Sequence, residues 1–96
     1  MKLMHAELAK TIPGPRTTEN DPDPVAVVKY FAGAWTWYAT EYDPDQRLFF
    51  GRVDGFESEL GYFGLAELED ARGPQGLRVE RDLYFRPTRL SEIPRA

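Results

Sequence analysis

The sequence has no cysteine and only one histidine, His5. Without cysteine the chain can form no disulfide, no thiolate metal site and no cysteine nucleophile. A nucleophilic serine site of the usual kind would have to use His5, because the nucleophile needs a nearby base. His5 falls in a short stretch with helical spacing near the N-terminus. We therefore interpret it as a solvent-exposed helix residue.

Long apolar runs are also absent. No stretch approaches the roughly 20 apolar residues that a membrane-spanning helix needs. The first residues lack the apolar centre of a signal peptide. The 96 residues are enough for one domain, residues 1–96, with a single modest core. We expect a soluble, intracellular protein.

The net charge of −4 is unevenly distributed along the chain. Residues 41–70 carry nine acidic side chains and only two arginines, for a net −7, whereas residues 71–96 carry six arginines and three acidic side chains, for +3. This acidic middle is unfavourable for broad binding to nucleic acid. The charges could pair with one another on a solvated surface, or form an acidic face that docks on a basic protein. The second interpretation assigns partner binding to eight residues: Asp43, Asp45, Asp54, Glu57, Glu59, Glu67, Glu69 and Asp70.

Periodicity and turn residues predict an α+β fold with a small, meander-like antiparallel sheet of about four to five strands and helices over one face. Trp35, Trp37 and Ala39 alternate with other residues at the period of two that a strand requires. Aspartate and proline at residues 43–46 predict a turn at the end of this strand. Helices are predicted at residues 3–10 and 65–71, strands at residues 25–31, 35–40, 48–50, 61–63 and 77–85, and a last turn at residues 87–93.

Paired carboxylates occur at Asp43 and Asp45, at Glu57 and Glu59, and at Glu67 and Asp70. Glycosidases need two carboxylates about 5–10 Å apart across a sugar-sized cleft, which a chain of this length rarely builds. A calcium loop that began at Asp43 would break off at Arg47 and Leu48. The glycines do not form a phosphate-binding loop. We therefore assign no catalytic residues, no metal ligands and no cofactor; whether a cation binds the acidic loops is left open by the sequence.

The aromatic residues could stack nucleic-acid bases if they were exposed on adjacent strands; the candidates are Phe49, Phe50, Tyr62, Phe63, Tyr84 and Phe85. Such platforms interleave aromatic with basic residues, whereas few arginines lie among the many acids here. Aromatic residues at strand spacing usually fill the core. We therefore interpret them as core residues; the alternative is that a few of them form an exposed partner-binding patch.

Five segments together resemble a known family: Trp37–Asp43, Phe49–Gly51, Glu59–Phe63, Leu65–Glu69 and Val79–Phe85. In order and spacing they are similar to the bacterial and phage family called domain of unknown function 2958 (DUF2958), over about Leu8 to Arg89. The resemblance implies a small protein of plasmids, conjugative elements and prophages, in the cytoplasm of a bacterial host. It carries over no catalytic residues. Acidic proteins of such elements are often counter-defence factors, and one group of anti-CRISPR proteins that inhibit the type II nuclease Cas9 is similar to this family.

Two hypotheses from different classes follow. The first is a non-enzymatic inhibitor that binds a defence protein, with Cas9 or its guide-RNA complex as the implied partner, through the acidic face. The second is a nucleic-acid-binding or replication accessory protein of a mobile element, which would use Arg78, Arg81, Arg86 and Arg89. A hydrolase that uses the paired acids has less support, because no base or cleft is indicated. Whether an open sheet edge pairs with a second copy is left undecided by the sequence.

Overall fold

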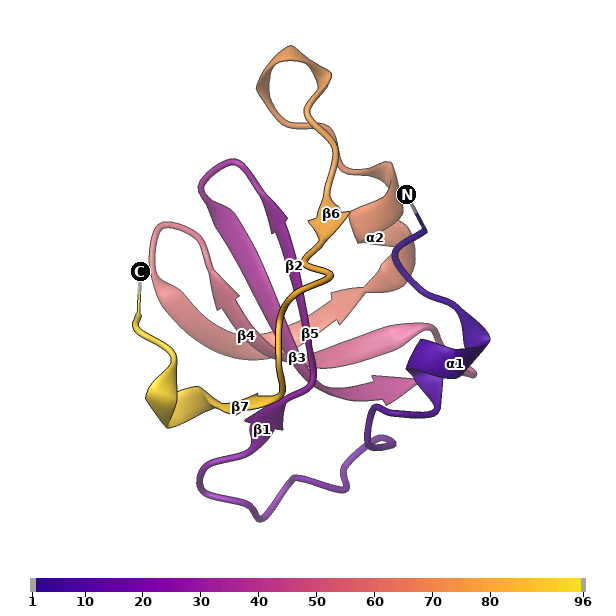
Figure 1. Cartoon of the computed structure of the whole chain (residues 1–96), viewed down its shortest axis with the longest axis vertical. Helices are drawn as coiled ribbons and strands as arrows, with labels where there is room; N and C mark the ends of the chain where they lie inside the picture. The colour runs from indigo at the N-terminus through magenta and orange to yellow at the C-terminus, as the bar shows by residue number, and fades with distance from the viewer. Residues whose placement is uncertain (1, 96) are drawn as a thin grey trace.

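The computed structural model describes residues 2–95 and confirms the predicted α+β fold. Five antiparallel strands form the main sheet in the order β5-β4-β3-β2-β6, and β1 pairs with β7 in a separate two-stranded sheet (Figure 1). The helices are α1 (Ala6–Ala9) and α2 (Leu65–Asp70), with 3-10 turns η1 (Pro74–Gly76) and η2 (Leu90–Glu92). The strands are β1 (Val25–Ala26), β2 (Val28–Ala32), β3 (Trp35–Asp43), β4 (Leu48–Asp54), β5 (Ser58–Gly64), β6 (Glu80–Arg81) and β7 (Thr88–Arg89).

The central strand β3 pairs antiparallel with its sequence neighbours β2 and β4, and β4 pairs in turn with β5. The predicted meander is therefore confirmed. One extra residue, Thr40, interrupts the register of β3 against β4. Side chains alternate along a strand, so this bulge keeps Ala39 and Tyr42 in the main core and turns Glu41 to the opposite face. Gly51 permits the close approach, since a Cβ there would lie 1.8 Å from the Tyr38 carbonyl oxygen.

The main core lies on the face of the sheet covered by α2 and the N-terminal segment (Figure 1). Phe49 lies among three other rings, with centroid distances of 5.4 Å to Tyr30, 4.6 Å to Tyr42 and 5.1 Å to Phe63. The Tyr30 hydroxyl donates to the Leu3 carbonyl at 2.7 Å, so this buried polar group is satisfied. Burial raises the pKa of Tyr30. The hydrogen bond also anchors the N-terminal segment to the sheet.

A second, smaller core lies on the other face, where Ala26, Tyr38 and Ile93 are buried together. The C-terminal segment covers this face and is tied to the loop before β1 through Asp23. The Asp23 carboxylate accepts from the Ser91 hydroxyl at 2.7 Å and from the Ser91 backbone N–H at 3.0 Å. These hydrogen bonds lower the pKa of Asp23. Each face of the sheet is thus covered by one end of the chain.

The predicted strand at residues 77–85 is mostly wrong. Only Glu80–Arg81 pairs with β2 as a strand, the Asp82 N–H donates once more to the Lys29 carbonyl at 2.9 Å, and the chain then turns. The Asp82 carboxylate accepts from the Tyr84 N–H at 2.9 Å, and its carbonyl accepts from the Phe85 N–H at 3.3 Å. An aspartate that bonds its own following backbone competes with the sheet ladder, which the alternating pattern could not reveal.

The N-terminal helix is shorter than residues 3–10, because it begins after His5 and spans only Ala6–Ala9. Leu3 lies before the helix and is buried in the main core. The helix α2 agrees with its prediction to within one residue, and the strand at residues 25–31 is present as β1 and β2. The last predicted turn contains β7 and η2.

Candidate protein-binding surface

The eight acidic residues of the sequence prediction do not form one face. Asp43 and Asp45 lie at the β3–β4 turn, whereas Glu57 and Glu59 lie at the β4–β5 hairpin, at the opposite end of β4. The seven residues of β4 separate these two ends by roughly 20 Å, at the usual rise per residue. The other three exposed acids, Glu67, Glu69 and Asp70, lie on α2.

Asp54 is not on the surface. Its carboxylate forms an ion pair of 3.0 Å with Arg52, and the two side chains are only 6% and 3% exposed. The Arg52 guanidinium also donates to the carbonyls of Leu90, Ile93 and Pro94 at 3.2, 3.0 and 3.0 Å. Asp54 therefore orients the arginine that fastens the C-terminal segment to the sheet, and it is not available to a partner.

Several acids at the β3–β4 end have structural partners. Asp43 accepts from the backbone N–H groups of Asp45 and Gln46 at 3.0 and 3.3 Å. Glu67 accepts from the Gly64 N–H at 3.1 Å, at the start of α2. Glu69 forms an exposed ion pair with Arg47 at 3.0 Å. These contacts close a turn, cap a helix and neutralise a charge. Fewer carboxylates are therefore available to a partner at this end than the sequence suggests.

The acids at the β4–β5 hairpin lie beside exposed aromatic side chains. Phe56 is 95% exposed at the tip of the hairpin, and its ring lies 5.8 Å from that of Trp35. Trp35 stacks on Trp37 at 6.1 Å. Glu57 and Glu59 border the same surface. We call this surface the aromatic shelf; it consists of Trp35, Trp37, Val53, Phe56, Glu57 and Glu59.

The ring of Trp35 is held in place by the hairpin opposite it. A Cβ at Gly55 would lie 2.4 Å from the indole, so only glycine lets the ring rest against the backbone there. Trp35 also lines an apolar groove of about 940 Å³ between the β2–β3 turn and the loop after α2. This loop projects beyond the sheet at the top of Figure 1. The groove is lined by Ala32, Gly33, Ala34, Trp35, Trp37, Ala71, Arg72, Gly73, Gln75, Leu77 and Val79.

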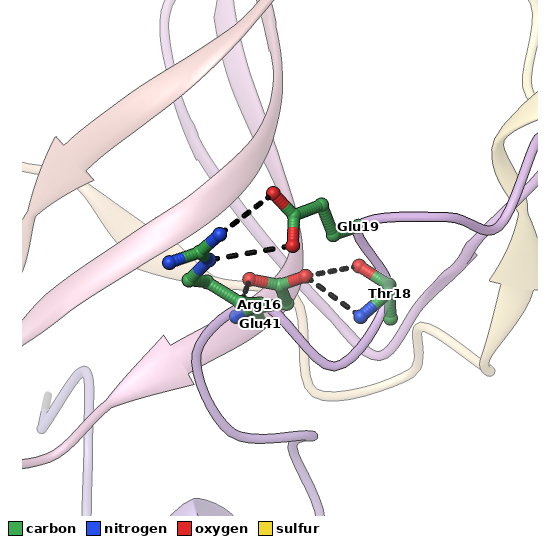
Figure 2. Close-up of polar contacts among 4 residues, drawn as sticks. All are labelled: Arg16, Thr18, Glu19 and Glu41. Carbon is green, nitrogen blue, oxygen red and sulfur yellow. Dashed lines mark hydrogen bonds and ion pairs between the residues drawn. The ribbon is translucent and has the colours of Figure 1, made fainter.

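Glu41 is a buried acid, which the sequence indicated only as one of the nine acidic side chains of residues 41–70. Its carboxylate accepts from the Arg16 N–H at 2.7 Å and from both the N–H, at 2.9 Å, and the hydroxyl of Thr18 (Figure 2). The Arg16 guanidinium in turn contacts Glu19. Glu41 thus pins the segment of residues 14–24, which we call the strap, to the sheet. The polar, proline-rich composition of the strap indicated a loop. It did not indicate that Glu41 would accept hydrogen bonds from this loop.

The remaining candidates have local roles. His5 caps α1, where its Nδ1 accepts from the Leu8 N–H at 3.2 Å, and its Nε2 lies 3.2 Å from the Arg81 guanidinium. Arg89 donates to the Asp23 carbonyl at 2.9 Å. Within residues 2–95 no cluster of three or more metal-binding side chains occurs, and no helix is long and apolar enough to cross a membrane.

The exposed aromatics are only partly those that the pattern indicated. Phe49 and Phe63 are buried, as expected for strand spacing, whereas Tyr62 and Tyr84 are exposed. Phe56 was not among the candidates, because it stands in a hairpin tip outside any periodic stretch. Its position between Gly55 and two glutamates was the one available signal: an aromatic residue in a polar turn has no core to enter.

No curated protein and no solved structure matches the chain. A family model does match, over residues 2–93, which is nearly the whole sequence. The five segments that carry the resemblance form β3, β4, β5, α2 and the stretch around β6. The chain belongs to the family described as "Protein of unknown function (DUF2958)".

Proposed function

We propose that this protein is a non-enzymatic, protein-binding inhibitor of a bacterial defence nuclease, with the RNA-guided nuclease Cas9 as the first partner to test. The observation that carries the proposal is the aromatic shelf. Phe56 is almost fully exposed beside Trp35 and is bordered by Glu57 and Glu59. The partner class is proposed because one group of anti-CRISPR proteins resembles this family, and the geometry of the aromatic shelf supports it as the contact surface.

The shelf has the composition of a binding hot spot. A few aromatic side chains usually carry most of the free energy of binding at a protein interface, and polar neighbours exclude water around them. Trp35 is positioned before any partner arrives, because it lies against Gly55 and stacks on Trp37. Less conformational entropy is therefore lost on binding. The adjacent groove offers space for an apolar side chain of the partner.

The acidic border determines which partners fit. Glu57 and Glu59 form no salt bridge within 4.0 Å among the described residues. Unpaired carboxylates beside an apolar surface favour a partner that presents arginine or lysine around its own apolar contact. A nuclease of the Cas9 type holds its guide and target strands in a positively charged channel. An acidic protein seated in or beside that channel would exclude DNA without any catalysis.

The test measures cleavage of target DNA by Cas9 loaded with guide RNA, with increasing amounts of this protein, and co-elution of the same samples in size-exclusion chromatography. We expect inhibition that depends on dose and weakens with added salt, because screening reduces long-range attraction. Phe56→Ala should weaken binding by about 10-fold or more, as hot-spot truncations do. Its fold should persist, since Phe56 is 95% exposed.

A charge-matched pair of variants locates the contact. Glu57→Lys with Glu59→Lys changes the charge beside the shelf, whereas Asp45→Lys with Asp70→Lys changes it equally at the opposite end and on α2. We expect the first pair to abolish inhibition and the second to reduce it only slightly. Equal loss in both pairs would indicate a dependence on net charge and not on the shelf. No inhibition and no co-elution with any of several type II nucleases would overturn the proposed partner.

Binding to nucleic acid is the second candidate function, and one observation favours it. Tyr84 is 93% exposed in a segment that also carries Arg81, Arg86 and Arg89. An exposed aromatic ring between arginines can stack on an unpaired base. A labelled single-stranded oligonucleotide, titrated at low salt, tests this candidate. Binding that Tyr84→Ala abolishes would support it, and no detectable binding would exclude it.

A further inference from the structure

One edge of the main sheet is open. The strand β5 is outermost in the order β5-β4-β3-β2-β6, and within residues 2–95 it is paired only with β4. At the other edge, the short β6 covers part of β2, and the chain beyond it crosses towards the β1–β7 pair (Figure 1). An uncovered edge strand presents backbone donors and acceptors that can pair with a further strand.

The hydrogen bonds at the two ends of β5 determine which of its residues face outward. The Leu65 N–H donates to the Arg47 carbonyl, and the Gly55 N–H donates to the Glu57 carbonyl. Residues 57 and 65 therefore direct their backbone groups towards β4, and alternation assigns the same direction to residues 59, 61 and 63. Residues 58, 60, 62 and 64 direct theirs to the open edge.

Two of these outward residues have already formed other contacts. The Gly64 N–H donates to the Glu67 carboxylate at 3.1 Å, and Ser58 also has a partner within the chain. Leu60 and Tyr62 lie between them, with no backbone hydrogen-bond partner among the described residues. Between Ser58 and Gly64, the open edge thus presents the N–H and C=O groups of Leu60 and Tyr62, separated by Gly61.

We infer that β5 pairs with β5 of a second copy of this chain, antiparallel about a two-fold axis at Gly61. In this register Leu60 faces Tyr62 of the second copy, and the reverse, so four backbone hydrogen bonds join the N–H and C=O groups of these two residues in both copies. A register centred on Tyr62 would place Gly64, whose N–H already donates to Glu67, opposite Leu60. The pairing centred on Gly61 joins Leu60 and Tyr62 to each other.

The side chains support the same register. Leu60 and Tyr62 lie on one face of the sheet and are 63% and 66% exposed. Each would cover the other across the axis, next to Phe50, whose ring already lies 5.0 Å from that of Tyr62. Glu59, the one charged side chain within the strand, would face Phe63 and not its own copy, so no like charges meet.

The size of this contact determines its strength. One strand pair buries less area than the roughly 1,200 Å² typical of stable complexes. The dimer should therefore form at high protein concentration and dissociate on dilution. Of the aromatic shelf it involves only Glu59, so Trp35 and Phe56 stay open to other partners, and the inference does not rest on the proposed function.

Cysteine crosslinking tests the register directly in a chain that has no cysteine of its own. Gly61→Cys would place two thiols on the axis, where Cα atoms of a non-hydrogen-bonded pair are about 4.5 Å apart and within disulfide range. Gly14→Cys is the matched control, because a Cβ at either glycine meets no atom within 4 Å. On mild oxidation we expect Gly61→Cys to form the covalent dimer at least about 10-fold faster, owing to its higher effective concentration. Equal rates would overturn the inference.

A second pair of variants removes the edge donor without cysteine chemistry. Leu60→Pro deletes an N–H that points away from β4, so the fold should tolerate it, and Leu60→Ala removes the same side chain but keeps the donor. In sedimentation at rising concentration, we expect Leu60→Pro to stay monomeric and Leu60→Ala to retain part of the dimer. Circular dichroism establishes that each variant is folded. Unchanged association of Leu60→Pro, or a wild-type chain that remains monomeric up to about 1 mM, would contradict the proposed pairing.

Discussion

Glu41 connects two parts of the chain that lie more than twenty residues apart, because its carboxylate accepts every hydrogen bond that fixes the strap at Arg16 and Thr18. Arg16 has a positive φ of 66°, a conformation that non-glycine residues rarely adopt without compensation. The three donors directed at one buried carboxylate supply that compensation. At the scale of single residues, the part of the strap around Arg16 and Thr18 is held by this acid, which the Thr40 bulge turns towards it.

Replacing Glu41 with glutamine should therefore destabilise the protein although the side chains are nearly the same size. An amide presents only one acceptor oxygen, and its NH₂ group would face the N–H of Arg16 or Thr18. We expect a loss of about 1.5–3 kcal/mol in the free energy of unfolding, the range for hydrogen bonds to charged groups. Urea denaturation measures it. Glu57→Gln, at an exposed acid, is the control and should be neutral; equal stability of the two variants would contradict the role of Glu41.

The β4–β5 hairpin is the element that combines both candidate surfaces. Its tip carries Phe56, and its second strand supplies the open edge with Leu60 and Tyr62. Two glycines of the hairpin differ in the space beside them. Gly55 lies against the ring of Trp35, whereas the space beside Gly61 is open. The same substitution should therefore have different consequences at the two sites.

Gly55→Ala should displace the Trp35 ring, because the new methyl group would lie 2.4 Å from it. The ring is partly exposed and can move, so we expect a loss of about 1 kcal/mol, at the low end for overpacking. The stacking of Trp35 on Trp37 should change, which circular dichroism of the indoles can detect. Gly61→Ala should leave this signal unchanged. An unaltered spectrum for Gly55→Ala would show that the ring is not held by the hairpin.

At the scale of the whole molecule, the two ends of the chain cover opposite faces of one sheet. The N-terminal end contributes Leu3 and Ile12 to the main core, and the C-terminal end contributes Ile93 to the smaller one. Within residues 2–95 the smaller core has only three buried residues, so the C-terminal segment that covers it is held mainly by polar contacts. The central contact is Arg52, which is paired with Asp54 and bonded to three carbonyls of the C-terminal segment.

Arg52→Met should cost about 3–5 kcal/mol, because it leaves the carboxylate of Asp54 buried without a counter-charge. The double variant Arg52→Met with Asp54→Leu should recover a large part of this loss, since two apolar side chains need no partner. Urea denaturation of the wild type, both single variants and the double variant forms a complete cycle. A double variant as unstable as Arg52→Met would mean that the bonds to the C-terminal carbonyls, and not the buried charge, dominate.

The meander and α2 could be predicted from the sequence because their signals are local. Alternation from Trp35 onward, the Asp-Pro turn and the spacing of Leu65 and Leu68 each act within a few residues, and the strands and helix form there. Where a local competitor was overlooked, as at Asp82, the prediction of a strand was wrong. The alternating pattern predicts which face of a sheet each side chain occupies. It does not indicate where an aspartate accepts hydrogen bonds from the following backbone N–H groups and so ends the strand.

By itself the sequence determined the fold class, the acidic middle segment and the absence of any cysteine chemistry. Only the tertiary structure decided how each acid is used: Asp54 pairs with Arg52, Glu41 holds the strap, and Glu57 stays free beside Phe56. The physical reason is distance along the chain. Glu41 is bonded to donors 23 and 25 residues away. Arg52, the partner of Asp54, is bonded to the carbonyls of residues 90, 93 and 94. No local pattern encodes these distant contacts.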